Sequence, residues 1–221
     1  MLNVSRLSVE QRYRLIYKPA LFIAGLTPAV LLTAGAFGVL GQNLGADPVA
    51  RILHSCGKTA LNFLLITLTV TPLKQLTGLT NLLRLRRMLG LFAFFYVCLH
   101  FLTYIGPDQS FVLSGMWKDV QKRRFITVGF LAFILLIPLA VTSTKGWIRR
   151  LGGKRWQTLH RSIYAAASCG VIHYYWLLKS DVRKPVFLGA IVAILLLWRL
   201  ISWFLKRNRS SKLSTTPVLS S

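Results

Sequence analysis

Acidic residues are scarce in this chain, which has five Asp and Glu against 28 Lys and Arg in 221 residues. None of the five lies inside a long apolar run. Proton relays and cation transporters place carboxylates inside their membrane spans, so the scarcity argues against both classes. The formal net charge of +23 comes from basic residues in short blocks between apolar runs. The positive-inside rule explains this pattern better than nucleic-acid binding does.

Cysteine is also rare. The three cysteines, Cys56, Cys98 and Cys169, are odd in number and have no metal-ligand spacing, so we expect neither a disulfide nor an iron–sulfur cluster. A zinc site would need a closer cluster of ligands. The G-x-G-x-x-G fingerprint of dinucleotide-binding domains is missing as well. We therefore do not expect this chain to bind a nicotinamide cofactor in the usual way.

Apolar sequence, in contrast, is abundant, at 54% of the residues. Runs of about 20 apolar residues are long enough to cross a bilayer. They predict an all-α membrane protein with six transmembrane helices, near residues 19–40, 52–72, 88–105, 125–141, 156–176 and 185–205. We expect one six-helix domain over residues 19–205, a cytoplasmic N-terminal segment 1–18 and a disordered cytoplasmic tail 206–221.

The basic residues orient these spans. Most Lys and Arg fall in the N-terminal segment, in the connections 74–87 and 142–156, and in the tail, whereas all four Asp residues fall on the opposite side. Cytoplasmic loops carry the excess of Lys and Arg. The pattern predicts that both termini are cytoplasmic.

Three of the four histidines lie in the third and fifth predicted spans. Counted from the basic border of each span at 1.5 Å per residue, His160 lies about 8 Å deep, His100 about 20 Å and His173 about 27 Å. A b-type haem between two helices needs two neutral imidazoles that face each other in a dry, apolar cavity. We therefore predict a His100–His173 pair in the outer half of the membrane. His160 would serve a second, inner station, although no histidine of the third span lies at its depth.

The 13-residue spacing of His160 and His173 puts them on different faces of an ideal helix. Either they meet different partner helices or the fifth span is locally distorted, for which a π-bulge is the usual means. A lone membrane histidine more often makes an interhelical hydrogen bond than binds a metal. Three histidines at compatible depths, without carboxylates beside them, favour haem.

Other polar residues within or beside the spans have two interpretations. Arg161, Arg87, Lys58 and His54 are candidate contacts of a haem propionate, a flavin phosphate or a quinone carbonyl. The alternative is that their long cationic side chains snorkel to the membrane surface. We favour this alternative for Lys58 and Arg199, and both interpretations stay open for Arg161. His54 is more typical of an interface residue than of a metal ligand.

Seven stretches together resemble the MsrQ (YedZ) family, over nearly the whole chain from about residue 19 to residue 205. They are LGADPV (44–49), TPL (71–73), RRMLGL (86–91), LH (99–100), TST (142–144), WQTLHRSIY (156–164) and IHYYW (172–176). More distantly the chain is similar to the transmembrane domain of ferric reductases and NADPH oxidases. In those proteins, histidines of the third and fifth spans hold two stacked haems.

The resemblance implies a multi-pass protein of the bacterial inner membrane that binds haem b, with FMN also found in the family. It implies that electrons pass from the quinone pool to MsrP, a periplasmic molybdopterin enzyme that repairs methionine sulfoxide in oxidised proteins. Because the chain has no nicotinamide fingerprint, the donor would be a membrane quinol or a separate flavin reductase. Carried over by residue, the haem-iron ligands would be His100, His173 and His160. The first histidine of the third span in the two-haem pattern is missing here, so a second haem and the pairing of His160 stay open.

This function requires an outer surface that binds the partner, and we expect it at Trp117, Lys118, Lys122, Arg123 and Arg124. Two other hypotheses remain. The chain could be an autonomous ferric or oxygen reductase of the inner membrane, which would bind haem but need no partner. It could also be a non-redox membrane scaffold, in which the histidines only join helices.

Overall fold

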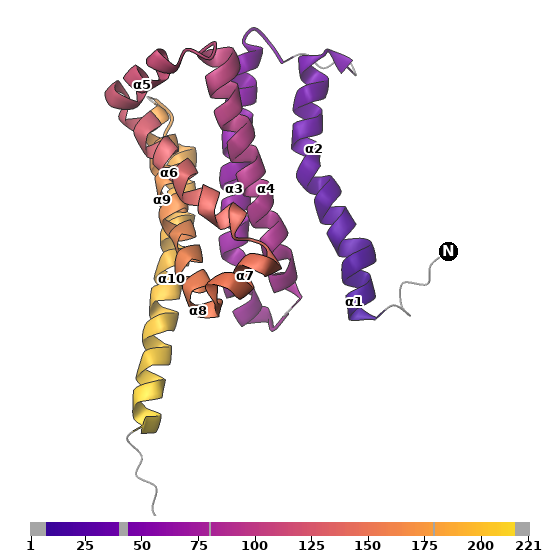
Figure 1. The fold of residues 1–221 in the computed structure, drawn as a ribbon, viewed down its shortest axis with the longest axis vertical. Helices are drawn as coiled ribbons and strands as arrows, with labels where there is room; N and C mark the ends of the chain where they lie inside the picture. Colours follow the sequence, from indigo (N-terminus) through magenta and orange to yellow (C-terminus); the bar gives the residue numbers. More distant parts are fainter. Residues whose placement is uncertain (1–7, 40–43, 80, 179, 215–221) are drawn as a thin grey trace, which may run out of the picture.

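The computed structural model describes residues 8–39, 44–79, 81–178 and 180–214. Over these residues the chain forms helices and short connections, without a β-strand (Figure 1). Five segments are long and apolar enough to cross a membrane, which agrees with five of the six predicted spans: Glu10–Ala36, Pro48–Thr77, Leu82–Asp108, Arg124–Val141 and Arg183–Leu205. The predicted end of the first span, near residue 40, lies outside the described residues.

The five segments correspond to the long helices of the fold. The first contains α1 (Val9–Arg12), a π-helical turn (Tyr13–Tyr17) and α2 (Lys18–Ala36). The next two are α3 (Pro48–Thr77) and α4 (Leu82–Thr103), which ends in a second π-helical turn (Tyr104–Asp108). The last two are α6 (Arg124–Val141) and α10 (Arg183–Ser214), so helical structure continues beyond residue 205, where we expected the tail to begin.

The predicted fifth span is divided into α8 (Gly153–His160) and α9 (Ser162–Leu177). Between them the N–H of Arg161 bonds to the carbonyl of Thr158, three residues earlier, at 3.1 Å, and the N–H of Tyr164 bonds to the carbonyl of Arg161 at 3.0 Å. The segment is therefore locally distorted, as one of the two predicted alternatives required. The distortion is a tightened turn, because each hydrogen bond joins residues three positions apart. A π-bulge would have bonds between residues five positions apart.

Two short helices lie at opposite ends of the bundle. The semi-apolar stretch after the third span forms α5 (Leu113–Lys122), and the basic loop before the fifth forms α7 (Lys145–Leu151). Thr144 caps α7 by accepting the N–H of Trp147 at 3.3 Å. In Figure 1, α5 lies at the upper end of the bundle, and α7 and α8 lie at the lower end. We refer to these as the α5 end and the α7–α8 end.

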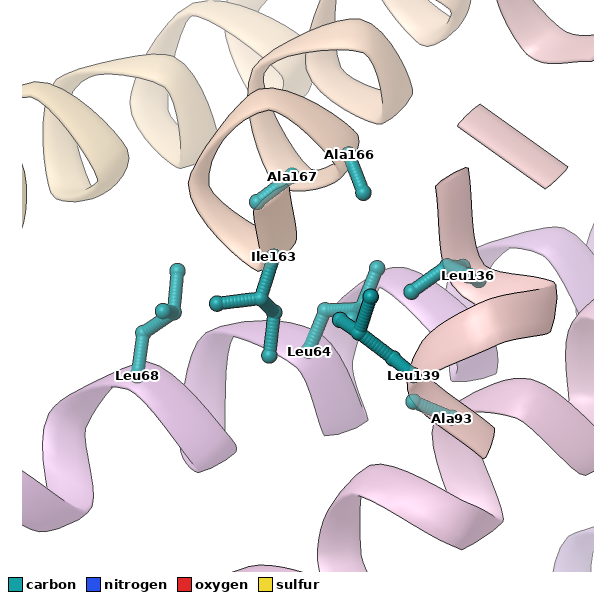
Figure 2. Packing of buried hydrophobic residues seen from close by; sticks show 8 residues of the cluster. All are labelled: Leu64, Leu68, Ala93, Leu136, Leu139, Ile163, Ala166 and Ala167. Carbon is teal, nitrogen blue, oxygen red and sulfur yellow. The ribbon is translucent and has the colours of Figure 1, made fainter. Parts of the chain in front are cut away.

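The core lies among α3, α4, α6 and α9. Figure 2 shows how Ile163, Ala166 and Ala167 of α9 face leucines of α3 and α6. Ala93 of α4, Ala166 and Ala167 have no exposed surface. Small residues let membrane helices approach closely, because packing and not the exclusion of water joins them. The remaining members of this cluster are Leu64, Leu68, Leu136 and Leu139.

The helix α2 lies beside the α3–α4 pair and is held by one tyrosine (Figure 1). The hydroxyl of Tyr96, on α4, donates to the carbonyl of Gly25 at 2.7 Å and accepts the N–H of Ala29 at 3.0 Å. These are the two groups that an unbroken helix would join to each other. Tyr96 is fully buried, so a side chain of α4 completes the backbone hydrogen bonding of α2.

Candidate functional site

His100 and His173 reach the same place from different helices. His100 lies on α4, and its Nδ1 is 2.9 Å from the carbonyl oxygen of Leu53 on α3. His173 lies on α9, and its Nδ1 is 2.6 Å from the carbonyl oxygen of Phe125 on α6. A carbonyl oxygen only accepts hydrogen bonds, so Nδ1 of each ring must carry the proton. In the neutral imidazole, Nε2 then holds the lone pair that a metal ion needs.

The two imidazoles face each other across a short gap. Their ring centres are 6.0 Å apart, and their planes make an angle of 81°. An imidazole nitrogen binds a metal at about 2 Å and lies about 1 Å from the centre of its own ring. Two imidazoles on opposite sides of one metal would therefore have ring centres roughly 6 Å apart. The spacing and the tautomers both fit two axial ligands of one haem iron. Metal-bound histidines commonly donate their other N–H to a carbonyl, as both of these do.

Phe125 on α6 lies against His173, and other aromatic residues of α4 and α6 pack on one another. The ring of Phe125 lies 5.9 Å from that of His173, and Phe101 lies 4.6 Å from Phe133. Phe94 stacks on Phe133 at 6.2 Å. The environment is therefore largely apolar, as a b-type haem requires.

His160 lies elsewhere, at the α7–α8 end, and its bonding is different. Its Nε2 is 3.0 Å from Oγ1 of Thr142, at the end of α6. The single hydroxyl proton of Thr142 is donated to the carbonyl of Pro138 at 2.6 Å, so the hydroxyl accepts from Nε2. The ring of His160 stacks on Trp156 at 4.0 Å, and the indole N–H of Trp156 bonds to the Thr142 carbonyl at 2.9 Å. His160 is thus held through Nε2, whereas His100 and His173 are held through Nδ1 and leave Nε2 available.

A cavity of about 550 Å³ opens beside His160. Segments from α3, α4 and α6 to α10 line it, and its lining includes no carboxylate. Four arginines contribute to its wall: Arg86, Arg87, Arg161 and Arg199. Two of these, Arg87 and Arg161, were predicted to contact an anionic or carbonyl group of a cofactor.

The other two arginines, Arg86 and Arg199, were not predicted as site residues. Nη2 of Arg199 donates to Oγ1 of Thr71 at 2.9 Å, and its guanidinium lies 4.7 Å from the ring centre of Tyr164. Arg86 reaches the same hydroxyl at 3.5 Å. The expectation that Arg199 snorkels to the membrane surface is therefore wrong, because its head group turns into the bundle. Its position within an apolar span was the signal that could have identified it.

The remaining predicted contacts are not at this cavity. His54 and Lys58 lie one turn apart on α3, and both side chains are exposed. Lys58 lines a separate cavity of about 420 Å³ with residues of α9 and α10, among them Tyr174 and Phe187. The structure therefore does not bring His54 and Lys58 together with Arg87 and Arg161.

The predicted docking residues form one surface at the α5 end. Trp117, Lys118 and Lys122 are exposed on α5, with Trp117 at 65%. The guanidinium of Arg123 pairs with Asp119 at 3.2 Å, and Arg124 begins α6. Phe125, whose carbonyl accepts from His173, is the next residue. The docking residues therefore end one position before Phe125, the residue that holds His173.

The comparisons with known proteins agree with one another and cover most of the chain. The model of the family described as "Ferric reductase like transmembrane component" matches residues 55–171. A protein of Herminiimonas arsenicoxydans is 50% identical over 91% of this chain and 92% of its own length. One of Rhodospirillum rubrum is 49% identical over 87% and 91%. One of Xanthomonas campestris is 45% identical over 90% and 93%. All three carry the name "Protein-methionine-sulfoxide reductase heme-binding subunit MsrQ".

Proposed function

The chain belongs to the MsrQ family within the ferric reductase-like membrane proteins, and from that premise we propose that it is a haem-bearing electron-transfer subunit. It takes electrons from membrane quinol and delivers them to MsrP, a periplasmic methionine sulfoxide reductase that repairs oxidised proteins. The observation that carries this proposal is the facing pair His100 and His173, whose tautomers and spacing suit one haem b.

A bound haem would supply one-electron transfer between the ferric and ferrous states of its iron. The protein residues set the conditions for that transfer. Leu53 and Phe125 hold the rings through Nδ1, which leaves Nε2 of each ring available to a metal. The apolar residues around the pair exclude water and favour the compact, low-dielectric site that tunes a redox potential.

The proposed topology has six spans, with α8 and α9 together as the broken fifth crossing. Two observations support it. The chain alternates direction along the bundle, so that α1 and the end of α10 lie at the same end (Figure 1). The exposed cations Arg149, Arg150, Lys154 and Arg155 also gather at that end. The α7–α8 end and both termini are then cytoplasmic, and the α5 end faces the periplasm of a bacterial inner membrane.

Electrons enter at the α7–α8 end in this proposal. The cavity there combines apolar walls with arginine donors, which suits the ring and hydroxyl oxygens of a quinol and the carbonyl oxygens of the quinone it becomes. A flavin such as FMN would use the same arginines for its phosphate. A second haem on His160 would require Thr142 to give up its bond to Nε2, so we propose one haem, at the α5 end.

Electrons leave at the α5 end. The docking surface of Trp117, Lys118, Lys122, Arg123 and Arg124 adjoins Phe125, which holds His173. A partner bound there would lie next to the haem edge. Exposed cations of one sign would also steer an acidic partner to this surface.

The direct test follows one electron through the purified protein. The protein is reconstituted in liposomes, and its optical spectrum is recorded oxidised, after addition of quinol, and after addition of MsrP with methionine sulfoxide. We expect reduction by quinol, followed by reoxidation that needs both MsrP and the sulfoxide.

Other outcomes would contradict the proposal in distinct ways. Reoxidation by ferric chelates or oxygen, at a rate that MsrP does not change, would identify an autonomous reductase. A colourless protein, still colourless after haem is supplied, would identify a scaffold without redox function.

A further inference from the structure

The same local arrangement occurs at both histidines of the pair. His100 donates to the carbonyl of Leu53, and four residues later in the same helix stands Gly57. His173 donates to the carbonyl of Phe125, and four residues later stands Gly129. The two acceptor helices, α3 and α6, are different, so the repetition is not one contact seen twice. Each histidine meets a carbonyl at position i and a glycine at position i+4.

Helix geometry explains why the glycine matters. A helical side chain covers the turn that precedes its own Cα, so a residue at i+4 shields the carbonyl of residue i from the outside. That carbonyl already accepts the backbone N–H of residue i+4, and its second lone pair is available only if no side chain covers it. Without a Cβ, Gly57 and Gly129 leave the second lone pair of Leu53 and Phe125 open to an imidazole.

The distances show that the rings occupy the space a side chain would take. A Cβ on Gly129 would lie 2.6 Å from Nδ1 and 2.9 Å from Cε1 of His173. A Cβ on Gly57 would lie 3.1 Å from both Nδ1 and Cε1 of His100. In each case the nearest atoms belong to the imidazole, so it is the histidine that would have to move. The effect should be larger at Gly129.

We propose that Gly57 and Gly129 are positioning residues that fix the tautomer and orientation of the two haem ligands by uncovering the carbonyls that hold them. This inference rests on the proposed function, since it assumes that His100 and His173 bind one haem. A hydrogen bond from Nδ1–H to a carbonyl makes the imidazole a stronger donor to the metal and favours the ferric state. Losing the bond shifts the reduction potential to a more positive value.

The test uses the full-length protein with haem bound and the variants Gly57→Ala and Gly129→Ala. The matched control is Gly170→Ala on α9, where a Cβ would make an ordinary contact of 3.4 Å with Leu61. Haem affinity, the low-spin optical spectrum and the reduction potential are measured. We expect Gly129→Ala to lose about 10- to 100-fold in haem affinity, as is typical when a metal-binding histidine loses its hydrogen-bond partner. We expect Gly57→Ala to keep its haem at a more positive potential, and Gly170→Ala to match the original protein.

The result that would overturn the inference is an unchanged potential and spectrum in both glycine variants, including one in which only the melting temperature falls. If Gly129→Ala does not fold, Gly57→Ala decides the question, because its contact is milder. A failure of the proposed function looks different. In that case the original protein has no haem, or its low-spin spectrum survives both His100→Ala and His173→Ala.

Discussion

At the α5 end of the bundle, His100 and His173 bond through Nδ1 to backbone carbonyls and face each other. At the α7–α8 end, His160 bonds through Nε2 to Thr142 and stacks on Trp156. The surroundings of His160 also include charge, because four arginines line the cavity beside it. Under the proposed function, one end would hold a metal between two rings, and the other would bind an anion or a polar oxygen. The hydrogen-bond partners of the histidines thus differ between the two ends, in addition to the depths that the sequence predicts.

The largest expected effect comes from removing one histidine at each end. His100→Ala and His173→Ala should each abolish the low-spin haem spectrum, because the iron loses an axial ligand. His160→Ala should leave that spectrum and the haem content of the purified protein unchanged. Optical spectra and a pyridine haemochrome count measure both. Loss of half the haem in His160→Ala would break the comparison and assign a second haem to the α7–α8 end.

The second prediction concerns the arginines at the α7–α8 end. Arg86→Gln and Arg199→Gln should each slow the reduction of haem by quinol about tenfold or more, since each removes a charge-assisted donor. Reduction by dithionite should be unaffected, because it does not need the cavity. Lys58→Gln is the control, as it removes a cation from a span but not from this cavity. An equal slowing with dithionite would show that the arginines support the fold and not a ligand.

The third prediction tests the surface at the α5 end. Lys118→Glu combined with Lys122→Glu should slow association with MsrP, roughly tenfold or more at low salt, and the difference should shrink as salt rises. Both side chains are exposed, so the fold should tolerate the change. The matched control, Arg149→Glu with Arg150→Glu, reverses two exposed charges on α7 at the other end. Association rates in a stopped-flow experiment measure the effect. Equal slowing by both pairs would place the docking surface elsewhere.

The smallest expected effect is at Thr142. Thr142→Val keeps the shape of the side chain but removes the hydroxyl that accepts from His160, which should cost about 1 kcal/mol of stability. The haem spectrum and reduction potential should not change. Thermal melting followed by circular dichroism, together with a redox titration, would measure both quantities. A changed potential would connect the two ends, contrary to the comparison.

The sequence predicted the all-helical class, five of the spans and the residues of the facing histidine pair. Hydropathy and residue depth carry that information, since both depend on position along one helix. A distortion of the fifth span was one of two predicted alternatives, but its position at Arg161 and its form as a tightened turn could not be predicted, because they depend on how α8 and α9 pack against α6. The inward turn of Arg199 was missed for a similar reason. Its partners, Thr71 and Tyr164, lie on other helices, and no local pattern joins them to it.

The hydroxyl of Tyr96, inserted into the backbone of α2, has a consequence for the order of synthesis. Ala29 and Tyr96 are separated by 67 residues, so α2 leaves the ribosome long before its partner exists. Until α4 is made, the carbonyl of Gly25 and the N–H of Ala29 can be satisfied only by each other, as in an ordinary helix. Docking then exchanges one bond inside α2 for two bonds to α4. The first helix can thus enter the lipid as an independent unit and join the bundle later, with the carbonyl of Gly25 and the N–H of Ala29 paired throughout.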